Sequence, residues 1–168
     1  MAKVNTILQG DVIERLKDIE DNTIQCVVTS PPYWGLRDYG EDNQLGLEET
    51  PEEYVENMVK VFREVRRALK DDGTLWLNLG DSYSSVGRST TTNQTLRGNN
   101  DYGVTRTKPS ENIKPKDLIG IPWRVAFALQ QDGWYLRQDI IWHKPNPMPE
   151  SVTDRCTKSH EYIFLLTK

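Results

Sequence analysis

The residues Ser30-Pro31-Pro32-Tyr33 combine a hydroxyl group, backbone carbonyl groups and an aromatic ring, and they directly follow the apolar run 26–29. Two consecutive prolines fix φ and remove two backbone donors, so the carbonyl oxygens around them stay free to accept hydrogen bonds. The residue before a proline is held in extended geometry, which keeps Ser30 and Pro31 out of a helix. This rigid corner could hold a flat heterocycle that carries an amino group.

Two aspartates occupy similar places in the sequence. Asp11 follows the predicted strand 4–8, and Asp81 follows the predicted strand 74–79. Ligands of open α/β sheets bind beyond the carboxyl ends of the strands, so these two residues and the Ser30 corner predict a site on one rim of the sheet. Each aspartate also has a simpler explanation, Asp11 as a helix N-cap and Asp81 as a turn residue.

The elements that must position this rim alternate between strands and helices. The helix that starts at Thr50 has the strongest signal, with Pro51 at its first position and Glu53 three residues after the cap. We expect Gly73 to end that helix. The predicted strands are 4–8, 24–29, 74–79, 135–143 and 160–168, and the predicted helices are 12–19, a long one from Thr50, and 122–131.

This alternation predicts an α/β fold with βαβ units and a mostly parallel sheet. The last two strands have no helix between them, so we expect an antiparallel hairpin at one edge of the sheet. The length predicts a single domain over residues 1–168. Among the tryptophans, Trp34 is the one expected to face the site.

Residues 84–116 differ from the rest of the chain. Ser84 to Thr107 is rich in Ser, Thr, Asn and Gly, and the segment is basic within a chain of net charge −4. Composition alone favours a solvated, disordered loop. The alternative is a loop that contacts nucleic acid, because Lys and Arg beside small polar residues suit phosphate groups.

Composition excludes several classes of protein. No apolar run has the roughly 18 residues of a membrane span, and residues 1–5 do not resemble a signal peptide, so we expect a cytoplasmic protein without a membrane partner. Cys26 and Cys156 are too few for a disulfide framework and are expected to be reduced. His143 and His160 have no partner at metal-ligand spacing, so we expect no metal site.

Several segments together resemble the amino-group DNA methyltransferases. Ser30-Pro31-Pro32-Tyr33 resembles the catalytic motif of the cytosine-N4 type, whereas the adenine-N6 type usually has Asp or Asn in place of Ser30. The similarity covers nearly the whole chain outside the basic loop, in the order of the permuted members. Its other segments are Gly10-Asp11, 77–82, 142–151 and 158–166.

The resemblance implies an incomplete, doubly wound, Rossmann-like sheet and methyl transfer from S-adenosylmethionine to DNA, as in restriction-modification. It implies that the Ser30 hydroxyl and the Pro31 carbonyl accept from the target amine, and that Tyr33 stacks on a flipped base beside Pro32. It also implies that Asp11 accepts from the adenine amine of the donor. Thr29 and Asp81 are then expected to lie near the donor.

One element of the resemblance is absent from the sequence. None of the eleven glycines forms the Gly-x-Gly pair of a donor-binding loop, which such enzymes carry nearer the C-terminus. We therefore expect weak donor binding and unpaired strand edges, which could pair with a second chain that supplies the loop or with another copy. The chain could be a truncated product, half of a split enzyme or an inactive DNA-binding remnant. Adenine-N6 transfer is the alternative activity.

Overall fold

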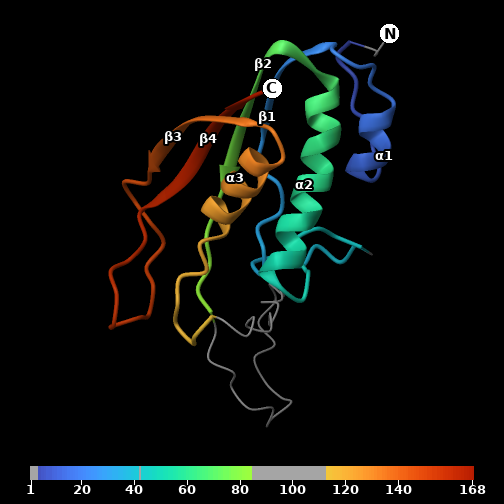
Figure 1. Ribbon diagram of the computed structural model, residues 1–168. Helices are drawn as coiled ribbons and strands as arrows, with labels where there is room; N and C mark the ends of the chain where they lie inside the picture. Colours follow the sequence, from blue (N-terminus) through green and yellow to red (C-terminus); the bar gives the residue numbers. More distant parts are fainter. Residues whose placement is uncertain (1–3, 42, 85–112) are drawn as a thin grey trace.

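The computed structural model describes residues 4–41, 43–84 and 113–168. In chain order its elements are α1 (Val12–Lys17), β1 (Ile24–Thr29), α2 (Pro51–Ala68), β2 (Leu69–Leu79), α3 (Ile121–Gln131), β3 (Tyr135–His143) and β4 (His160–Thr167), and Figure 1 shows their arrangement. The predicted strands 24–29 and 135–143 are confirmed with those bounds, and so is the start of the long helix after Thr50. Most of the predicted basic loop, residues 85–112, lies outside the described residues.

The four strands form one mixed sheet in the order β1-β2-β4-β3. β1 pairs with β2 in parallel, and β4 pairs with both β2 and β3 antiparallel. β1, β2 and β3 therefore run in the same direction, and β4 runs opposite to them between β2 and β3. Two of the three pairings among the described strands are antiparallel, so the expected mostly parallel sheet is wrong for these strands. The expected antiparallel hairpin is confirmed, with β3 on the edge.

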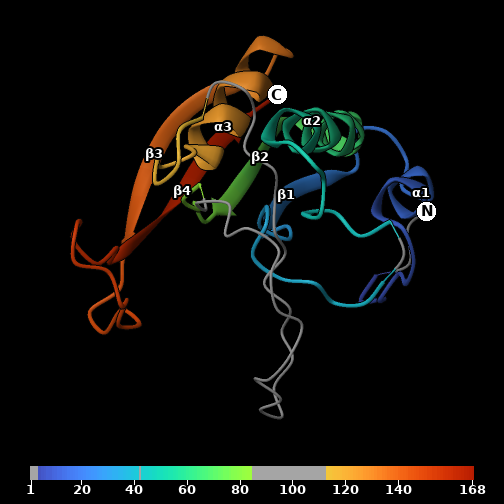
Figure 2. The ribbon, with the colours of Figure 1, turned by 90° about the horizontal axis from the view of Figure 1, so that it is seen from below.

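Helices α2 and α3 lie on the same face of the sheet (Figure 2). Every second residue near the end of β2 points into this layer, and Leu75, Leu77 and Leu79 are fully buried there. Phe164 of β4 and Trp34 belong to the same core. On the opposite face Val28 is exposed. The helices cover one face of the sheet, so the side chains that alternate with these leucines along β2 point to the other face and can take part in a site.

The start of α2 has the expected capping box. The Thr50 hydroxyl accepts from the Glu53 amide at 3.2 Å, and the Glu53 carboxylate accepts from the Thr50 amide at 3.4 Å. The expected end at Gly73 is wrong, because the helix ends at Ala68 and Gly73 lies within β2. A Cβ on Gly73 would lie 2.9 Å from the Lys70 carbonyl oxygen, so this glycine serves a close backbone approach.

The predicted strand 4–8 is not formed. Val4 is 85% exposed and Ile7 is 94% exposed, and no strand pairs with this segment among the described residues. A strand needs a neighbour for its backbone groups, so an apolar run with strand propensity stays irregular without one. In the part of the chain that the structure describes, no helix is long and apolar enough to span a membrane.

Candidate active site

Two cavities meet at the Ser30 corner. One has a volume of about 930 Å³, and its lining includes Asp11, Thr29, Ser30, Pro31 and Pro32. The other has a volume of about 410 Å³ and is lined in part by Tyr33, Gly80 and Asp81. Ser30, Pro31 and Pro32 thus line the larger cavity, and the next residue, Tyr33, lines the smaller one. The structure brings together six of the seven predicted site residues around Ser30, and it places Asp81 with Tyr33 rather than with Asp11.

The hydroxyl of Ser30 belongs to a hydrogen-bonded cluster at the end of β1 and β2. Its Oγ lies 3.1 Å from the Tyr33 hydroxyl and 3.4 Å from Asn78 Oδ1. The Tyr33 hydroxyl lies 2.8 Å from Asn78 Oδ1 and 3.2 Å from Glu161 Oε2. The side chains of β2, β4 and the corner therefore converge on one phenol.

The orientation of Asn78 determines the direction of these hydrogen bonds. Its Nδ2 donates to the Tyr162 carbonyl at 3.1 Å, which turns Oδ1 toward Tyr33. Because Oδ1 can only accept, the Tyr33 hydroxyl donates to it, and that phenol oxygen can then accept from Ser30. Ser30 thus directs its single proton into the cluster. Its lone pairs remain for a ligand.

Burial raises the pKa of the Tyr33 phenol, and the neighbouring Glu161 carboxylate acts in the same direction, although the Ser30 hydrogen bond opposes them. A raised pKa keeps the phenol protonated at neutral pH, which the donation to Asn78 requires. Glu161 is held from its other side by Lys144, whose Nζ lies 3.2 Å from Oε1. The Tyr33 phenol thus has one proton for two acceptors, of which Asn78 Oδ1 is the nearer, and Lys144 offsets the charge of Glu161.

The carbonyl groups of the two prolines differ. The Pro32 carbonyl accepts from the hydroxyl of buried Tyr54 at 2.9 Å, so the expectation that it stays free is wrong. The Pro31 carbonyl has no such partner among the described residues. Ser30 Oγ and the Pro31 carbonyl are therefore the two acceptors that the corner can offer.

Asp11 is confirmed as the N-cap of α1. Its Oδ1 accepts from the Ile13 amide at 3.0 Å and from the Glu14 amide at 3.1 Å. The residue also lines the larger cavity with Thr29, the last residue of β1. Both cap hydrogen bonds use the same carboxylate oxygen, so one side chain can support the helix and still offer its other oxygen to a ligand.

Asp81 has a structural role that its sequence position did not reveal. Its Oδ1 accepts from the backbone amides of Ser82 at 2.9 Å and of Gly120 and Ile121 at 3.0 Å. Gly120 is the N-cap of α3 and has no side chain of its own to cap the helix. Asp81 therefore supplies this cap from another part of the chain, and its charge suits the helix N-terminus.

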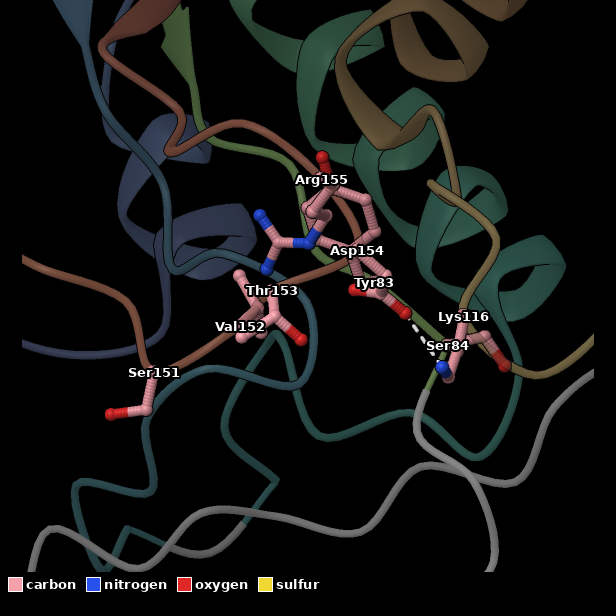
Figure 3. Close-up of a pocket in the computed structure, with 8 residues that line it drawn as sticks. All are labelled: Tyr83, Ser84, Lys116, Ser151, Val152, Thr153, Asp154 and Arg155. Atoms are coloured by element: carbon pink, nitrogen blue, oxygen red, sulfur yellow. Dashed lines mark hydrogen bonds and ion pairs between the residues drawn. The ribbon is translucent and has the colours of Figure 1, made fainter.

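A third cavity, of about 550 Å³, lies between residues 151–155 and the pair Tyr83 and Ser84 (Figure 3). Its two cations are already paired, Lys116 with Asp154 at 2.6 Å and Arg155 with Glu150. The Arg155 guanidinium also stacks 3.7 Å from the centre of the Tyr83 ring. This cavity holds none of the predicted site residues.

Sequence reasoning missed the roles of Asn78 and Glu161. Asn78 alternates with the buried Leu77 and Leu79, and that period of two could have placed its side chain on the open face of β2. Glu161 has no comparable local signal. The expectation that Trp34 faces the site is wrong, since it is 2% exposed and its Nε1 donates to the Glu48 carbonyl at 3.0 Å.

Comparisons with known proteins show the family of the chain. The model of the DNA methylase family, which covers N6 and N4 methyltransferases, matches residues 24–168. The Type II methyltransferase M.SmaI of Serratia marcescens is 58% identical over 96% of this chain and 55% of its own length. M.Cfr9I of Citrobacter freundii is 53% identical over 97% of this chain and 54% of its own length. The chain thus spans about half the length of these curated relatives.

Solved structures share the fold. A DNA modification methylase from Thermus thermophilus, in complex with S-adenosyl-L-methionine, matches 95% of this chain and 51% of its own with a TM-score of 0.62 and 24% identity. The cytosine-N4-specific PvuII DNA methyltransferase matches 94% of this chain and 47% of its own with a TM-score of 0.61 and 19% identity. With the family match over most of its length, the chain belongs to the DNA methylase family.

Proposed function

We propose that the chain forms the base-holding part of an S-adenosylmethionine-dependent DNA methyltransferase that acts on the exocyclic N4 amine of cytosine. The observation that carries this proposal is the hydrogen bonding of Ser30. Its Oγ lies 3.1 Å from a phenol that is itself committed to Asn78, so its lone pairs are left to accept from an amine. The Pro31 carbonyl provides the second acceptor.

The chemistry needs acceptors at this place. The amine of cytosine is a poor nucleophile because its lone pair is delocalised into the ring. Acceptors that bind its N–H groups favour a more tetrahedral nitrogen and are strengthened as positive charge develops on it, which stabilises the transition state. The methyl group passes from the sulfonium sulfur to N4, the sulfur keeps the bonding electrons, and the amine then releases a proton to solvent.

The larger cavity suits the donor. Asp11 and Thr29 line it beside Ser30 and Pro31, so a donor there would lie next to the two acceptors that hold the target amine. Asp11 would accept from the donor adenine through the oxygen that the helix cap leaves available. The sequence has no Gly-x-Gly, so we propose that polypeptide beyond these 168 residues supplies the donor loop.

DNA is the proposed partner, and the basic segment 84–116 is proposed to contact it. A base within a duplex must leave the stack to reach the corner. Tyr33 is proposed to offer its ring to the flipped base, which would offset part of the lost stacking. The recognition sequence would then be read outside the corner.

A methylation assay with labelled donor tests the proposal. The chain is incubated with DNA alone and together with a polypeptide that carries the glycine-rich loop, either as a separate chain or as a fusion. We expect label on DNA in the second case only, and isothermal titration should show no micromolar donor affinity for the chain alone. Absence of label in both cases would favour an inactive DNA-binding remnant, and label as N6-methyladenine would favour the adenine-specific alternative.

A further inference from the structure

Lys158 carries an ammonium group whose hydrogen-bonding capacity is unused in the described structure. Its Nζ is buried and has no hydrogen-bond partner there. The residue lies in the connection between β3 and β4 and lines the 410 Å³ cavity together with Tyr33 and Gly80. The ring centre of Tyr162 lies 5.9 Å from Nζ, at the limit of a cation–π contact.

The carboxylates around Lys158 are engaged elsewhere. Glu161 binds Lys144 at 3.2 Å and the Tyr33 hydroxyl at 3.2 Å. Asp81 accepts three backbone amides at the start of α3, and Glu150 pairs with Arg155. Burial lowers the pKa of Lys158, while the charges of Asp81, Glu161 and Glu150 oppose that shift and that of Arg155 adds to it. The ammonium therefore lacks a close acceptor, which is costly for a buried donor.

The charge of the cavity indicates what kind of acceptor would fit. Its lining contains the three acids Asp81, Glu150 and Glu161 and the two lysines Lys144 and Lys158, a net charge of −1 with His160 neutral. An anionic group such as a phosphate would meet this excess of carboxylates. A neutral carbonyl oxygen would satisfy the ammonium without that repulsion.

We propose that Lys158 donates to the O2 carbonyl of the target cytosine and thereby selects cytosine over adenine. This inference rests on the proposed function of the Ser30 corner. Cytosine carries its N4 amine and O2 carbonyl at opposite ends of one edge. Tyr33 is hydrogen-bonded to Ser30 and lines the same cavity as Lys158, so a base beside this ring can direct N4 to the acceptors Ser30 and Pro31 and O2 to Lys158. Adenine has an amine but no carbonyl, and would leave the ammonium unpaired. A site that is built to hydrogen-bond a group discriminates strongly against ligands that lack it.

The test is nucleoside binding to the purified chain, measured by saturation-transfer NMR, which detects millimolar affinities. The ligands are deoxycytidine, deoxyadenosine, deoxycytidine monophosphate and the C-nucleoside of 2-aminopyridine, which keeps the amine and the neighbouring ring nitrogen of cytosine but has C–H in place of the O2 carbonyl. The variants are Lys158→Met and Lys158→Arg, with Lys60→Met on the exposed side of α2 as the matched control. Thermal unfolding checks that each variant is folded.

We expect Lys158→Met to weaken deoxycytidine binding about 10-fold or more, Lys158→Arg to keep most of it, and Lys60→Met to leave it unchanged. The analogue without O2 should bind the wild type and Lys158→Met equally. Deoxycytidine binding that is unaffected by Lys158→Met would overturn this inference while the base pocket stands. If deoxycytidine monophosphate binds more tightly than deoxycytidine, and Lys158→Met removes that difference, Lys158 binds phosphate and the inference is overturned. Binding of neither nucleoside to the wild type would overturn both the inference and the base pocket.

Discussion

The backbone of Gly80 packs directly against the ring of Tyr33. A Cβ atom at Gly80 would lie 2.5 Å from Tyr33 Cε2 and 2.6 Å from Cδ2. Since no side chain tolerates that distance, the glycine is what allows the phenol to reach Asn78 and Glu161. The position of the ring, and through it the orientation of the Ser30 hydroxyl, depends on a residue without a side chain at the end of β2.

Replacement of Gly80 by alanine should therefore displace Tyr33. We expect Gly80→Ala to cost about 1–3 kcal/mol of unfolding free energy through overpacking and to abolish deoxycytidine binding. Urea unfolding and NMR titration measure the two effects. Gly40→Ala is the control, because nothing lies within 4 Å of its added Cβ, although its φ of +76° adds some strain. Equal nucleoside binding by both variants would contradict the role of Gly80.

Variants of Asn78 test the direction of the hydrogen bonds. Asn78→Asp keeps the nearer acceptor of the Tyr33 hydroxyl, whereas Asn78→Leu removes it and leaves the phenol proton to Glu161 alone, which draws the phenol away from Ser30. We expect Asn78→Leu to lower the kcat of the complete enzyme by about 10-fold or more, with KM for DNA little changed, and Asn78→Asp to retain more of it. A loss in KM alone, or equal losses in both variants, would contradict the argument.

Alanine variants of Asp81 and Asp11 should differ in their effects: one mainly lowers the stability of the fold, and the other mainly weakens donor binding. Asp81→Ala removes the acceptor of three backbone amides, including two at the start of α3, so it should cost about 1–3 kcal/mol of unfolding free energy. Asp11→Ala uncaps the six-residue helix α1, so its effect on stability should be smaller. In the complete enzyme, Asp11→Ala should weaken S-adenosylmethionine binding more than Asp81→Ala does. The reverse order in calorimetric titration would assign Asp81 to the donor.

The stability of the fold should decrease in alkaline solution. Burial, with the charge of Glu48, raises the pKa of the Tyr54 phenol well above its usual value. The unfolded chain loses this proton near pH ~10 while the folded chain keeps it, so this contribution is complete below that pH and is lost as the pH rises further.

Urea unfolding between about pH 8 and pH 11 measures this effect. Tyr54→Phe should flatten the alkaline decrease, apart from a constant loss of its hydrogen bond to the Pro32 carbonyl. Tyr135→Phe, at an exposed position, serves as the control and should keep the wild-type slope. Identical slopes for the wild type and Tyr54→Phe would contradict the assignment.

Local signals in the sequence were sufficient for some elements. The cap of α2 involves only Thr50, Pro51 and Glu53, so it could be predicted from adjacent residues. The corner at Ser30 could be identified because proline geometry is local. By contrast, Gly73 is a misleading end signal for α2, because the sequence does not reveal that the chain turns directly from Ala68 into β2.

Contacts between distant segments could not be predicted. The hydrogen bond from Tyr33 to Glu161 joins residues 128 positions apart and depends on the antiparallel register of β2 and β4. The cap that Asp81 gives to α3 likewise spans the segment 82–119. Residues 4–8 show the opposite failure, since their strand propensity has no effect without a neighbouring strand.

The most direct test of the central claim is the identity of the methylated nucleoside. DNA is treated with labelled S-adenosylmethionine and the chain completed with a glycine-loop polypeptide, and is then digested to nucleosides. We expect label in N4-methyldeoxycytidine, and its loss in Ser30→Ala with unfolding unchanged, because Ser30 is exposed. Label in N6-methyldeoxyadenosine, or undiminished label with Ser30→Ala, would contradict it.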